Sequence, residues 1–204
     1  MLWGYANGIF PMAMSADDPE LHWFDPPERG ILPVRGVHIS RSMRRDLGRT
    51  GWHATLNRDF PGVIRACAAR EETWINAPLF ALYQELHGIG HAHSLEIRDA
   101  GGDLVGGVFG LSLGAAFFGE SMFSARRSGS KAALIFLSAH LSACGFALFD
   151  TQYPTPHLAS MGGQTISRGD YQLRLARAVA VRADITSRPL PDLQSILQPR
   201  TQTS

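Results

Sequence analysis

The sequence has little cysteine, no long apolar run and almost no net charge, and each shortage excludes a class of protein. Its two cysteines, Cys67 and Cys144, lie in separate apolar, helix-like stretches, which predicts buried reduced thiols rather than a disulfide framework. No stretch reaches the roughly 18 apolar residues that a membrane-spanning helix needs. Residues 1–10 lack the basic region of a signal peptide. Together these shortages predict a cytoplasmic protein.

The formal net charge of +1 at pH 7 shows that the chain is not a bulk polycation. Binding to a nucleic acid would therefore depend on a local basic patch. Apolar residues make up 45% of the 204-residue chain, enough to bury a core without disulfides or metals. His91 and His93 would share one face of a strand, but no further ligands accompany them at metal-binding spacing. We expect no metal.

The periodicity of the apolar residues predicts an α+β fold. Helices are expected at 59–70, 77–88, 131–144 and 169–178, with a helical turn at 157–161 and another helix start after Ser40 or Ser42. Strands are expected at 35–40, 52–56, 93–98, 103–113, 115–123, 146–150 and 164–167. Turn formers at 8–11 and 25–30 predict loops. This order of elements resembles the GNAT acyltransferase fold.

Two polar groups follow strands that are otherwise apolar. Glu120 ends the apolar run 115–118, and a carboxylate there is costly unless it is paired or faces a cleft. The apolar residues that precede Glu120 favour a cleft. The alternative is an exposed carboxylate at the edge of a sheet. Asp150 and Gln152 follow the next strand and point to the same side if that strand stays extended. Ordinary polar loop residues are the alternative there.

Basic residues form two local groups. Arg126, Arg127 and Lys131 flank the start of a predicted helix, where free N–H groups and partial positive charge favour phosphate. A second group shares one face at helical spacing, at Arg41, Arg44, Arg45 and Arg49. Both groups suit a polyanion such as RNA, and both can equally be solvated surface, the second partly paired with Asp46.

Trp74 lies between two predicted helices. Burial in the core is the usual outcome for such a residue, and a stacking platform for a nucleotide base is the alternative.

Several short motifs follow one another in a specific order: Tyr5-Ala6-Asn7-Gly8-Ile9-Phe10-Pro11, His38-Ile39-Ser40-Arg41-Ser42, Thr73-Trp74-Ile75, Gly90-His91-Ala92-His93-Ser94, Leu104-Val105-Gly106-Gly107, Gly119-Glu120-Ser121-Met122-Phe123-Ser124, Ser130-Lys131, and Asp150-Thr151-Gln152 through His157-Leu158-Ala159-Ser160. Over residues 5–175 this order resembles the leucyl/phenylalanyl-tRNA–protein transferase family. The resemblance implies transfer of Leu or Phe, and less well Met, from aminoacyl-tRNA to a protein N-terminal Arg or Lys, feeding N-degron proteolysis.

The resemblance also implies a domain organisation and a set of partners. A reduced N-terminal domain is expected at 1–30, a GNAT-like aminoacyltransferase domain at 31–186 and a loose C-terminal tail at 187–204. No cofactor is needed, because the activated ester arrives on the tRNA. The expected partners are the acceptor end of aminoacyl-tRNA and proteins with N-terminal Arg or Lys, with no membrane, and we expect a monomer.

The same resemblance implies roles for individual residues. Asp150 and Gln152 would orient the attacking amine and the carbonyl, with Asp150 as a further proton acceptor. Glu120 would attract the cationic N-terminus or relay a proton. An apolar pocket for the Leu or Phe side chain would be lined by Val108, Phe117, Leu134, Leu137 and Phe149. Contacts to the adenosine and the tRNA would come from Trp74, Arg41, Arg44, Arg45, Arg126, Arg127 and Lys131.

One departure from the family bears on the adenosine contact, and one geometric condition bears on the cleft. Many members have Trp where this chain has Met12, so Trp74 or Trp23 would contribute more to holding the terminal adenosine. Phe117 and Glu120 lie on opposite faces of a regular strand and can share a cleft only if the strand bends at Gly119.

Two rival functions are a CoA-dependent GNAT N-acetyltransferase and a non-catalytic RNA-binding module.

Overall fold

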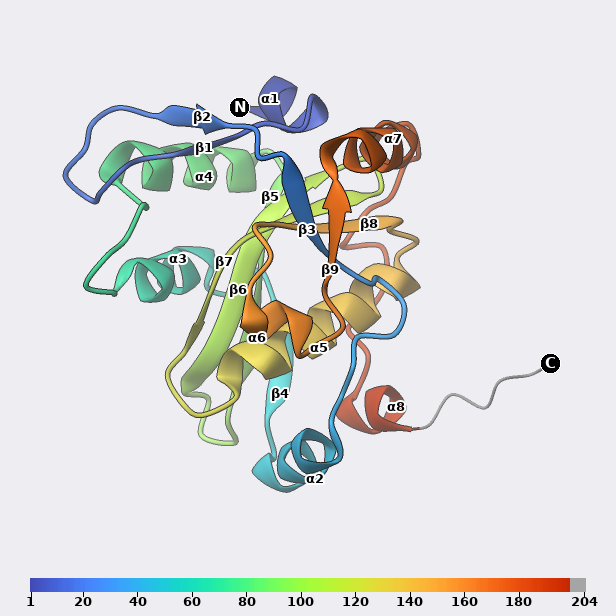
Figure 1. Ribbon diagram of the computed structural model, residues 1–204. Coiled ribbons are helices and arrows are strands. Elements are labelled where there is room, and N and C mark those ends of the chain that lie inside the picture. The colour runs from blue at the N-terminus through green and yellow to red at the C-terminus, as the bar shows by residue number, and fades with distance from the viewer. Residues whose placement is uncertain (199–204) are drawn as a thin grey trace.

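A mixed seven-stranded sheet dominates the computed structural model, which describes residues 1–198 (Figure 1). The strand order is β4-β5-β6-β7-β8-β3-β9, and only β7 and β8 run parallel. The strands span β3 (Glu28–Leu32), β4 (His53–Leu56), β5 (Ala92–Arg98), β6 (Leu104–Leu113), β7 (Ala116–Ser124), β8 (Leu148–Gln152) and β9 (Gln164–Ser167). A separate hairpin joins β1 (Phe10–Met12) to β2 (His22–Phe24). The predicted α+β class is confirmed.

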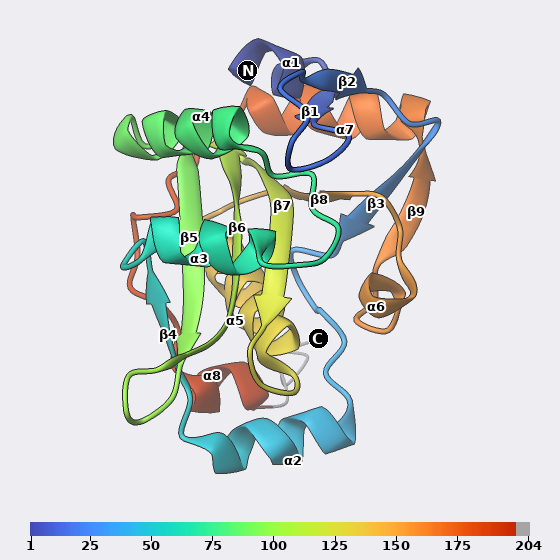
Figure 2. The same cartoon turned by 90° about the vertical axis from the view of Figure 1, so that its left-hand side faces the viewer.

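Helices cover both faces of this sheet. They span α1 (Leu2–Ala6), α2 (Arg41–Thr50), α3 (Phe60–Ala68), α4 (Ala77–Gly88), α5 (Gly129–Ala143), α6 (Pro156–Ala159), α7 (Arg168–Val179) and α8 (Leu193–Leu197). Figure 2 shows α3 and α4 in front of β5, β6 and β7, with α5 behind them. Each face therefore has its own apolar core, one beneath α3, α4 and α7 and the other around α5.

Local sequence explains where most helices begin. Ser40 accepts a hydrogen bond from the Met43 N–H and so caps α2, while Asn76 caps α4 in the same way through the Leu79 N–H. The helix predicted at 77–88 has these bounds in the structure, and the three strands predicted over 93–123 form the antiparallel meander β5-β6-β7. The strong local signals are thus confirmed.

Three predictions from local pattern are corrected. Residues 35–40 contain no strand and instead lead into α2. The loop predicted at 25–30 overlaps β3, which pairs with β8 and β9, more than a hundred residues away in the sequence. Tertiary pairing overrides a turn-rich composition here. The described part of the expected loose tail, 187–198, includes α8, whose apolar side chains pack on the α5 core, and residues 199–204 lie outside the described part.

The sheet opens where β7 leaves β8. Their pairing covers only Ala116–Phe118 of β7, and immediately beyond it the pairing of β7 with β6 is interrupted by a bulge. Gly119 pairs with Gly110 and Ser121 with Phe109, so that Glu120 is the extra residue. Gly110 permits this approach, because a Cβ there would collide with the Phe118 carbonyl oxygen. An irregularity is therefore present next to Gly119, but it falls at Glu120, and it does not bring Phe117 and Glu120 into one cleft as predicted.

None of the helices within residues 1–198 combines the length and the apolar character needed to cross a membrane.

Candidate active site

A cavity of about 250 Å³ lies where β7 and β8 separate. Its polar wall comes from the bulge of β7 and the end of β8, and its apolar wall comes from both sides of the sheet. The lining residues include Met12, Arg70, Trp74, Val108, Glu120, Leu134, Phe149, Gln152 and Tyr153. The cavity thus combines an apolar surface with one carboxylate and one amide.

Glu120 is held at the cavity wall by two hydrogen bonds. The Tyr83 hydroxyl donates to Oε2 at 2.8 Å, and the Gln152 side-chain Nε2 donates to Oε1 at 2.9 Å. Only 7% of Glu120 is exposed. Burial raises the pKa of Glu120 to about 7, against the opposing effect of the hydrogen bond from Tyr83. The carboxylate can therefore change protonation state near neutral pH.

Gln152 owes its position to an irregular backbone. Its φ is +62°, in the left-handed region that a glutamine rarely adopts. The pairing of β8 with β3 also shifts, since Gln152 pairs with Gly30 and Asp150 with Ile31, leaving Thr151 as the extra residue. Simple alternation along an extended strand, which put Asp150 and Gln152 on one side, is therefore wrong here. The strained conformation instead directs the Gln152 amide at Glu120.

Asp150 is completely buried and does not line the cavity. Its carboxylate accepts hydrogen bonds from the Arg29 guanidinium, with Nη2 to Oδ2 at 2.7 Å and Nε to Oδ1 at 3.0 Å. The Tyr171 hydroxyl donates to Oδ2 at 2.7 Å and the Gln152 backbone N–H to Oδ1 at 2.7 Å. With four donors around it, Asp150 is placed to hold the Gln152 backbone rather than to touch a substrate.

Arg29 is enclosed as fully as its partner. The guanidinium carbon lies 4.6 Å from the ring centre of Phe10 and 4.4 Å from that of Tyr171, and Nη1 donates to the Gly8 carbonyl oxygen at 3.0 Å. The N-terminal segment, β3, β8 and α7 therefore meet at this ion pair.

The structure divides the residues expected to form the side-chain pocket. Val108, Leu134 and Phe149 line the cavity. Phe117 and Leu137 do not, and both are buried in the α5 core, where the Phe117 ring packs edge-on against Phe149. The bulge thus brings Glu120 to the cavity without bringing Phe117 there.

Two residues on the opposite wall are of interest for nucleotide binding. Trp74 and Met12 both line the cavity, and Trp74 is only half-buried. Trp23 does not line the cavity. It lies on β2, 50% exposed, against Gly4. Trp74 and Trp23 were the two candidates to replace the tryptophan that many family members have at the position of Met12. Of these two, only Trp74 lines the cavity.

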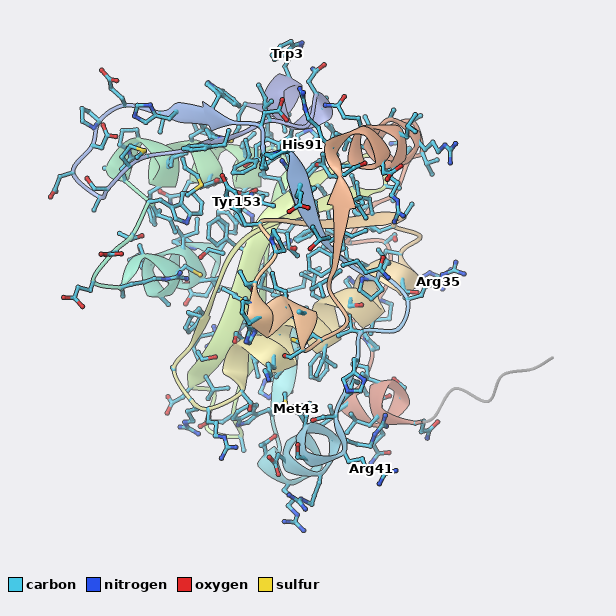
Figure 3. All side chains as sticks on the ribbon, viewed as in Figure 1. Trp3, Arg35, Arg41, Met43, His91 and Tyr153 are labelled. Carbon is cyan, nitrogen blue, oxygen red and sulfur yellow. The ribbon has the colours of Figure 1, made fainter. Side chains whose placement is uncertain are left out.

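The basic residues are spread more widely than the sequence suggested. Arg41, Arg45 and Arg49 are exposed on α2, and Arg45 lies 3.7 Å from Asp46. Arg44 turns away from that stripe and lines a separate hollow beside α5 and α8. Figure 3 shows Arg41 at the foot of the molecule and Tyr153, which lines the cavity, in its upper half. The α2 stripe is therefore remote from the cavity.

The second basic group does not line the cavity either, and Lys131 lines a hollow that it shares with Ser40 and Met43 at the start of α2. Arg126 pairs with Asp99, at 2.7 Å, and approaches Asp103 at 3.9 Å. Arg127 and Lys131 have no carboxylate within ion-pair distance in the described part of the chain. They lie at the start of α5, as predicted.

The histidines and cysteines are used structurally. His93 is buried and bonds to Asn57, Ser112 and a backbone carbonyl, and burial lowers the pKa of His93 to about 4. Residues 1–198 contain no cluster of three or more His, Cys, Asp or Glu side chains arranged for a metal ion. Cys67 is a free thiol, and burial raises its pKa to about 12.

Sequence reasoning missed Arg29, Tyr83, Tyr171 and Arg70. Arg29 lies in the segment taken for a loop, and its partner Asp150 is 121 residues away, so no local pattern connects them. Tyr83 lies among the buried apolar residues of α4, Leu79 and Leu86. Its hydroxyl was the available signal, because a buried tyrosine hydroxyl requires a hydrogen-bond partner.

Fold and site together define the class first: an α+β protein with an enzyme-like cavity that holds a buried, titratable carboxylate. Comparison with known proteins defines the family. Residues 31–176 match the family described as Leucyl/phenylalanyl-tRNA protein transferase, and residues 1–27 match the N-terminal domain of that family. The chain belongs to the leucyl/phenylalanyl-tRNA–protein transferase family.

Individual relatives agree with this assignment. A leucyl/phenylalanyl-tRNA–protein transferase of Paracoccus denitrificans (strain Pd 1222) is 64% identical over 204 residues, covering 100% of this chain and 96% of the relative. One from Dinoroseobacter shibae (strain DSM 16493 / NCIMB 14021 / DFL 12) is 56% identical, covering 94% and 85%. A solved structure, L-PGS from Bacillus licheniformis, has a TM-score of 0.43 at 14% identity over 78% of this chain and 54% of that one, a similarity too low to assign the fold.

Proposed function

We propose that this protein transfers Leu or Phe, and less well Met, from aminoacyl-tRNA to the α-amino group of a protein N-terminal Arg or Lys. The cavity between β7 and β8 supports this function most directly. It joins an apolar pocket to the Glu120–Gln152 pair beside Trp74. Such a cavity has room for an apolar side chain, an ester and the end of a nucleotide.

The reaction is the aminolysis of an ester. The amine nitrogen attacks the aminoacyl carbonyl, the terminal ribose oxygen leaves, and one proton passes from the amine to that oxygen. An α-amino group has an ordinary pKa of about 7.7–8.0, so a useful fraction is already neutral at pH 7. Holding the two reactants together can therefore supply much of the rate, up to roughly 7–11 kcal/mol.

Within this reaction Glu120 attracts the cationic N-terminus of the acceptor protein or relays a proton from its amine. Its carboxylate faces the cavity, and burial raises its pKa to about 7, close to that of the amine. Gln152 holds Glu120 through its amide nitrogen and leaves its amide oxygen to accept a hydrogen bond from the attacking amine. Asp150, enclosed by Arg29 and Tyr171, positions the Gln152 backbone and is not the base.

The aminoacyl side chain occupies the apolar part of the cavity, between Val108, Leu134 and Phe149. One methylene contributes only about 1–3 kcal/mol in such a pocket, so Leu, Phe and Met are separated modestly. Trp74, with Met12 beside it, is placed to stack on the terminal adenine.

We also propose that residues 31–186 form a GNAT-like acyltransferase domain preceded by a small N-terminal domain at 1–30. The order of helices and strands around the parallel pair β7 and β8 supports this assignment. The product, a protein with a new N-terminal Leu or Phe, would enter N-degron proteolysis.

A single-turnover assay tests the function. Purified protein is mixed with Leu-tRNA and a peptide that begins with Arg, and the peptide mass is measured. Addition of one leucyl residue is expected with the Arg peptide and not with the same peptide acetylated at its N-terminus, because acetylation removes the nucleophile. A peptide that stays unmodified while Leu-tRNA remains charged would overturn the proposal.

A further inference from the structure

A hollow of about 330 Å³ lies between α2, α5 and α8. It shares no described lining residue with the cavity between β7 and β8. Figure 1 shows α2 and α8 together at the foot of the view, and α8 also packs on α5. We call this space the α8 hollow. It is separate from the proposed active site.

Most of the wall of the α8 hollow is apolar. Ile135 and Ala139 come from α5, and Ile196 comes from α8. The segment that leads into α2 adds Val34, Val37 and Ile39. A ligand in the hollow would therefore bury apolar surface against several elements at once.

The hydroxyl groups of the wall already have acceptors within the protein. Ser138 Oγ donates to the backbone carbonyl oxygens of Pro33 and Val34, each 3.1 Å away. Ser195 Oγ donates to the Asp192 carbonyl oxygen at 2.8 Å. A ligand with many polar groups would find few free donors here, which argues against a sugar or a nucleotide.

Arg44 is different from these hydroxyls. It is the only charged side chain among the described residues that line the hollow. Its Nη1 atom is buried and has no hydrogen-bond partner within residues 1–198. No carboxylate lies within ion-pair distance of its guanidinium in that part of the chain, whereas the neighbouring Arg45 approaches Asp46. A buried donor without an acceptor is unfavourable, and a bound anion would satisfy it.

We propose that the α8 hollow binds a medium-chain carboxylate, with the carboxylate on Arg44 and the alkyl chain between α5 and α8. One cation matches one negative charge, and the planar guanidinium fork fits a carboxylate with two parallel hydrogen bonds. A phosphate dianion would leave one charge without a partner. The volume is at the lower end for ligand pockets and suits a ligand of about ten non-hydrogen atoms, such as octanoate.

Three ligands with the same chain and different charge test the hollow. Isothermal titration of the full chain is carried out with octanoate, octanamide and octylamine. Octanoate should bind with a Kd of roughly 0.1–1 mM, and at least about tenfold more tightly than the other two, because only octanoate pairs with a guanidinium. Methyl NMR locates the ligand: the signals of Ile39, Ile135 and Ile196 should shift, and that of Val108 in the cavity should not.

Two variants separate the charge of the site from its space. Arg44→Gln should weaken octanoate binding by at least about tenfold. Ala139→Leu should abolish the binding by filling the hollow from α5 without changing any charge. The matched control is Arg35→Gln, which removes an exposed cation next to Val34 that does not line the hollow, and it should bind octanoate normally.

Urea unfolding gives an independent measure and shows that each variant is folded. Octanoate at ten times its Kd should lower the unfolding equilibrium constant of the unsubstituted protein by about elevenfold. In Arg44→Gln and Ala139→Leu this effect of octanoate should be largely lost.

Several outcomes would overturn the inference. Equal binding of octanoate and octanamide would show that Arg44 selects no anion, and shifts at Val108 alone would place the ligand in the cavity. Binding of N-acetyl-leucyl-leucine in place of octanoate would assign the hollow to the C-terminus of a protein. No binding of octanoate at 10 mM, about ten times the weakest Kd expected, would remove the site. None of these results depends on whether the protein transfers leucine.

Discussion

At the residue scale, two buried carboxylates lie close to the same glutamine and have different environments. Glu120 faces the cavity with two neutral donors, Tyr83 and Gln152. Asp150 faces away from it and is enclosed by the Arg29 guanidinium. Burial in a pocket with neutral donors raises the pKa of Glu120 to about 7. We therefore expect Glu120 to take part in proton transfer and Asp150 to position Gln152.

The pKa of Glu120 predicts a pH dependence. Between about pH 6 and 8 the carboxylate ionises, and the rate of transfer should rise with it and also with the neutral fraction of the amine. In Glu120→Gln only the ionisation of the amine should remain, and the rate should fall about 10²–10⁴-fold. Single-turnover rates measured across this range check the prediction. An inflection near 7 that persists in Glu120→Gln would assign it to another group.

The same shift predicts a change in stability. Because the folded state raises the pKa of Glu120 from its ordinary value of 4.5 to about 7, it binds this proton more tightly than the unfolded state does. The stability from this proton is complete below about pH 4.5 and is lost as the pH rises through about 7. Glu120→Gln should remove this component, which the difference in urea unfolding between the two proteins over that range would show.

The ion pair of Arg29 and Asp150 predicts a large cost for removing either charge. Asp150→Asn keeps the shape of the side chain but leaves the Arg29 cation buried without an anion, so the free energy of unfolding should fall by about 3–5 kcal/mol. Asp46→Asn, on the exposed pair with Arg45, should cost less than about 1 kcal/mol. Urea denaturation compares the two variants. Equal costs would mean that the buried pair contributes no more than the exposed one.

At the element scale, the bulge of β7 falls at Glu120, the carboxylate that lines the cavity. A regular strand would alternate, and Glu120 would then take the face opposite to its neighbours at 119 and 121. The extra residue breaks this alternation at the point where β7 loses β8, and the strain in β8 at Gln152 does the same on the facing strand. A bulge within β7 and an irregular end of β8 therefore meet where the Gln152 amide donates to the Glu120 carboxylate.

Gly110 makes the bulge sterically possible, which predicts the effect of a small substitution. Gly110→Ala puts a Cβ against the Phe118 carbonyl oxygen and should shift β7 away from β6, lowering both stability and transfer, with a stability cost of about 1–3 kcal/mol. Gly48→Ala is the control, because a Cβ there meets nothing within 4 Å on α2 and should be neutral or stabilising. Urea midpoints and single-turnover rates would be measured for both. Unaltered transfer by Gly110→Ala would show that the bulge tolerates the Cβ.

At the scale of the whole molecule, the stripe of Arg41, Arg45 and Arg49 lies apart from the cavity, on α2 at the foot of the view in Figure 1. No residue of α2 lines the cavity. We therefore expect this stripe to attract the body of the tRNA rather than its reacting end.

Reversing the charge of this stripe tests that role. Arg41→Glu with Arg45→Glu should weaken Leu-tRNA binding and flatten its salt dependence, because long-range attraction to the phosphates is lost. Transfer from 2′(3′)-O-leucyl-adenosine, a donor without phosphates, should be unaffected, since α2 does not line the cavity. Binding titrations at several salt concentrations provide the measurement. A salt slope equal to that of the unsubstituted protein would exclude α2 from the interface.

The sequence by itself determined the α+β class, the meander β5-β6-β7 and the helix 77–88. These follow from apolar periodicity and turn residues, which act over a few residues. Alternation along a strand puts Phe117 and Glu120 on opposite faces, and the structure does separate them, since Phe117 lies in the α5 core and Glu120 lines the cavity.

Only the tertiary structure decided the rest. β3 becomes a strand because β8 and β9 pair with it, Arg29 becomes the partner of Asp150 across 121 residues, and Phe117 enters the core instead of the cavity. Hydrogen bonds and ion pairs between distant segments leave no periodic trace in the chain. The two carboxylates look alike in sequence, and their roles diverge only because burial and one guanidinium give them different surroundings.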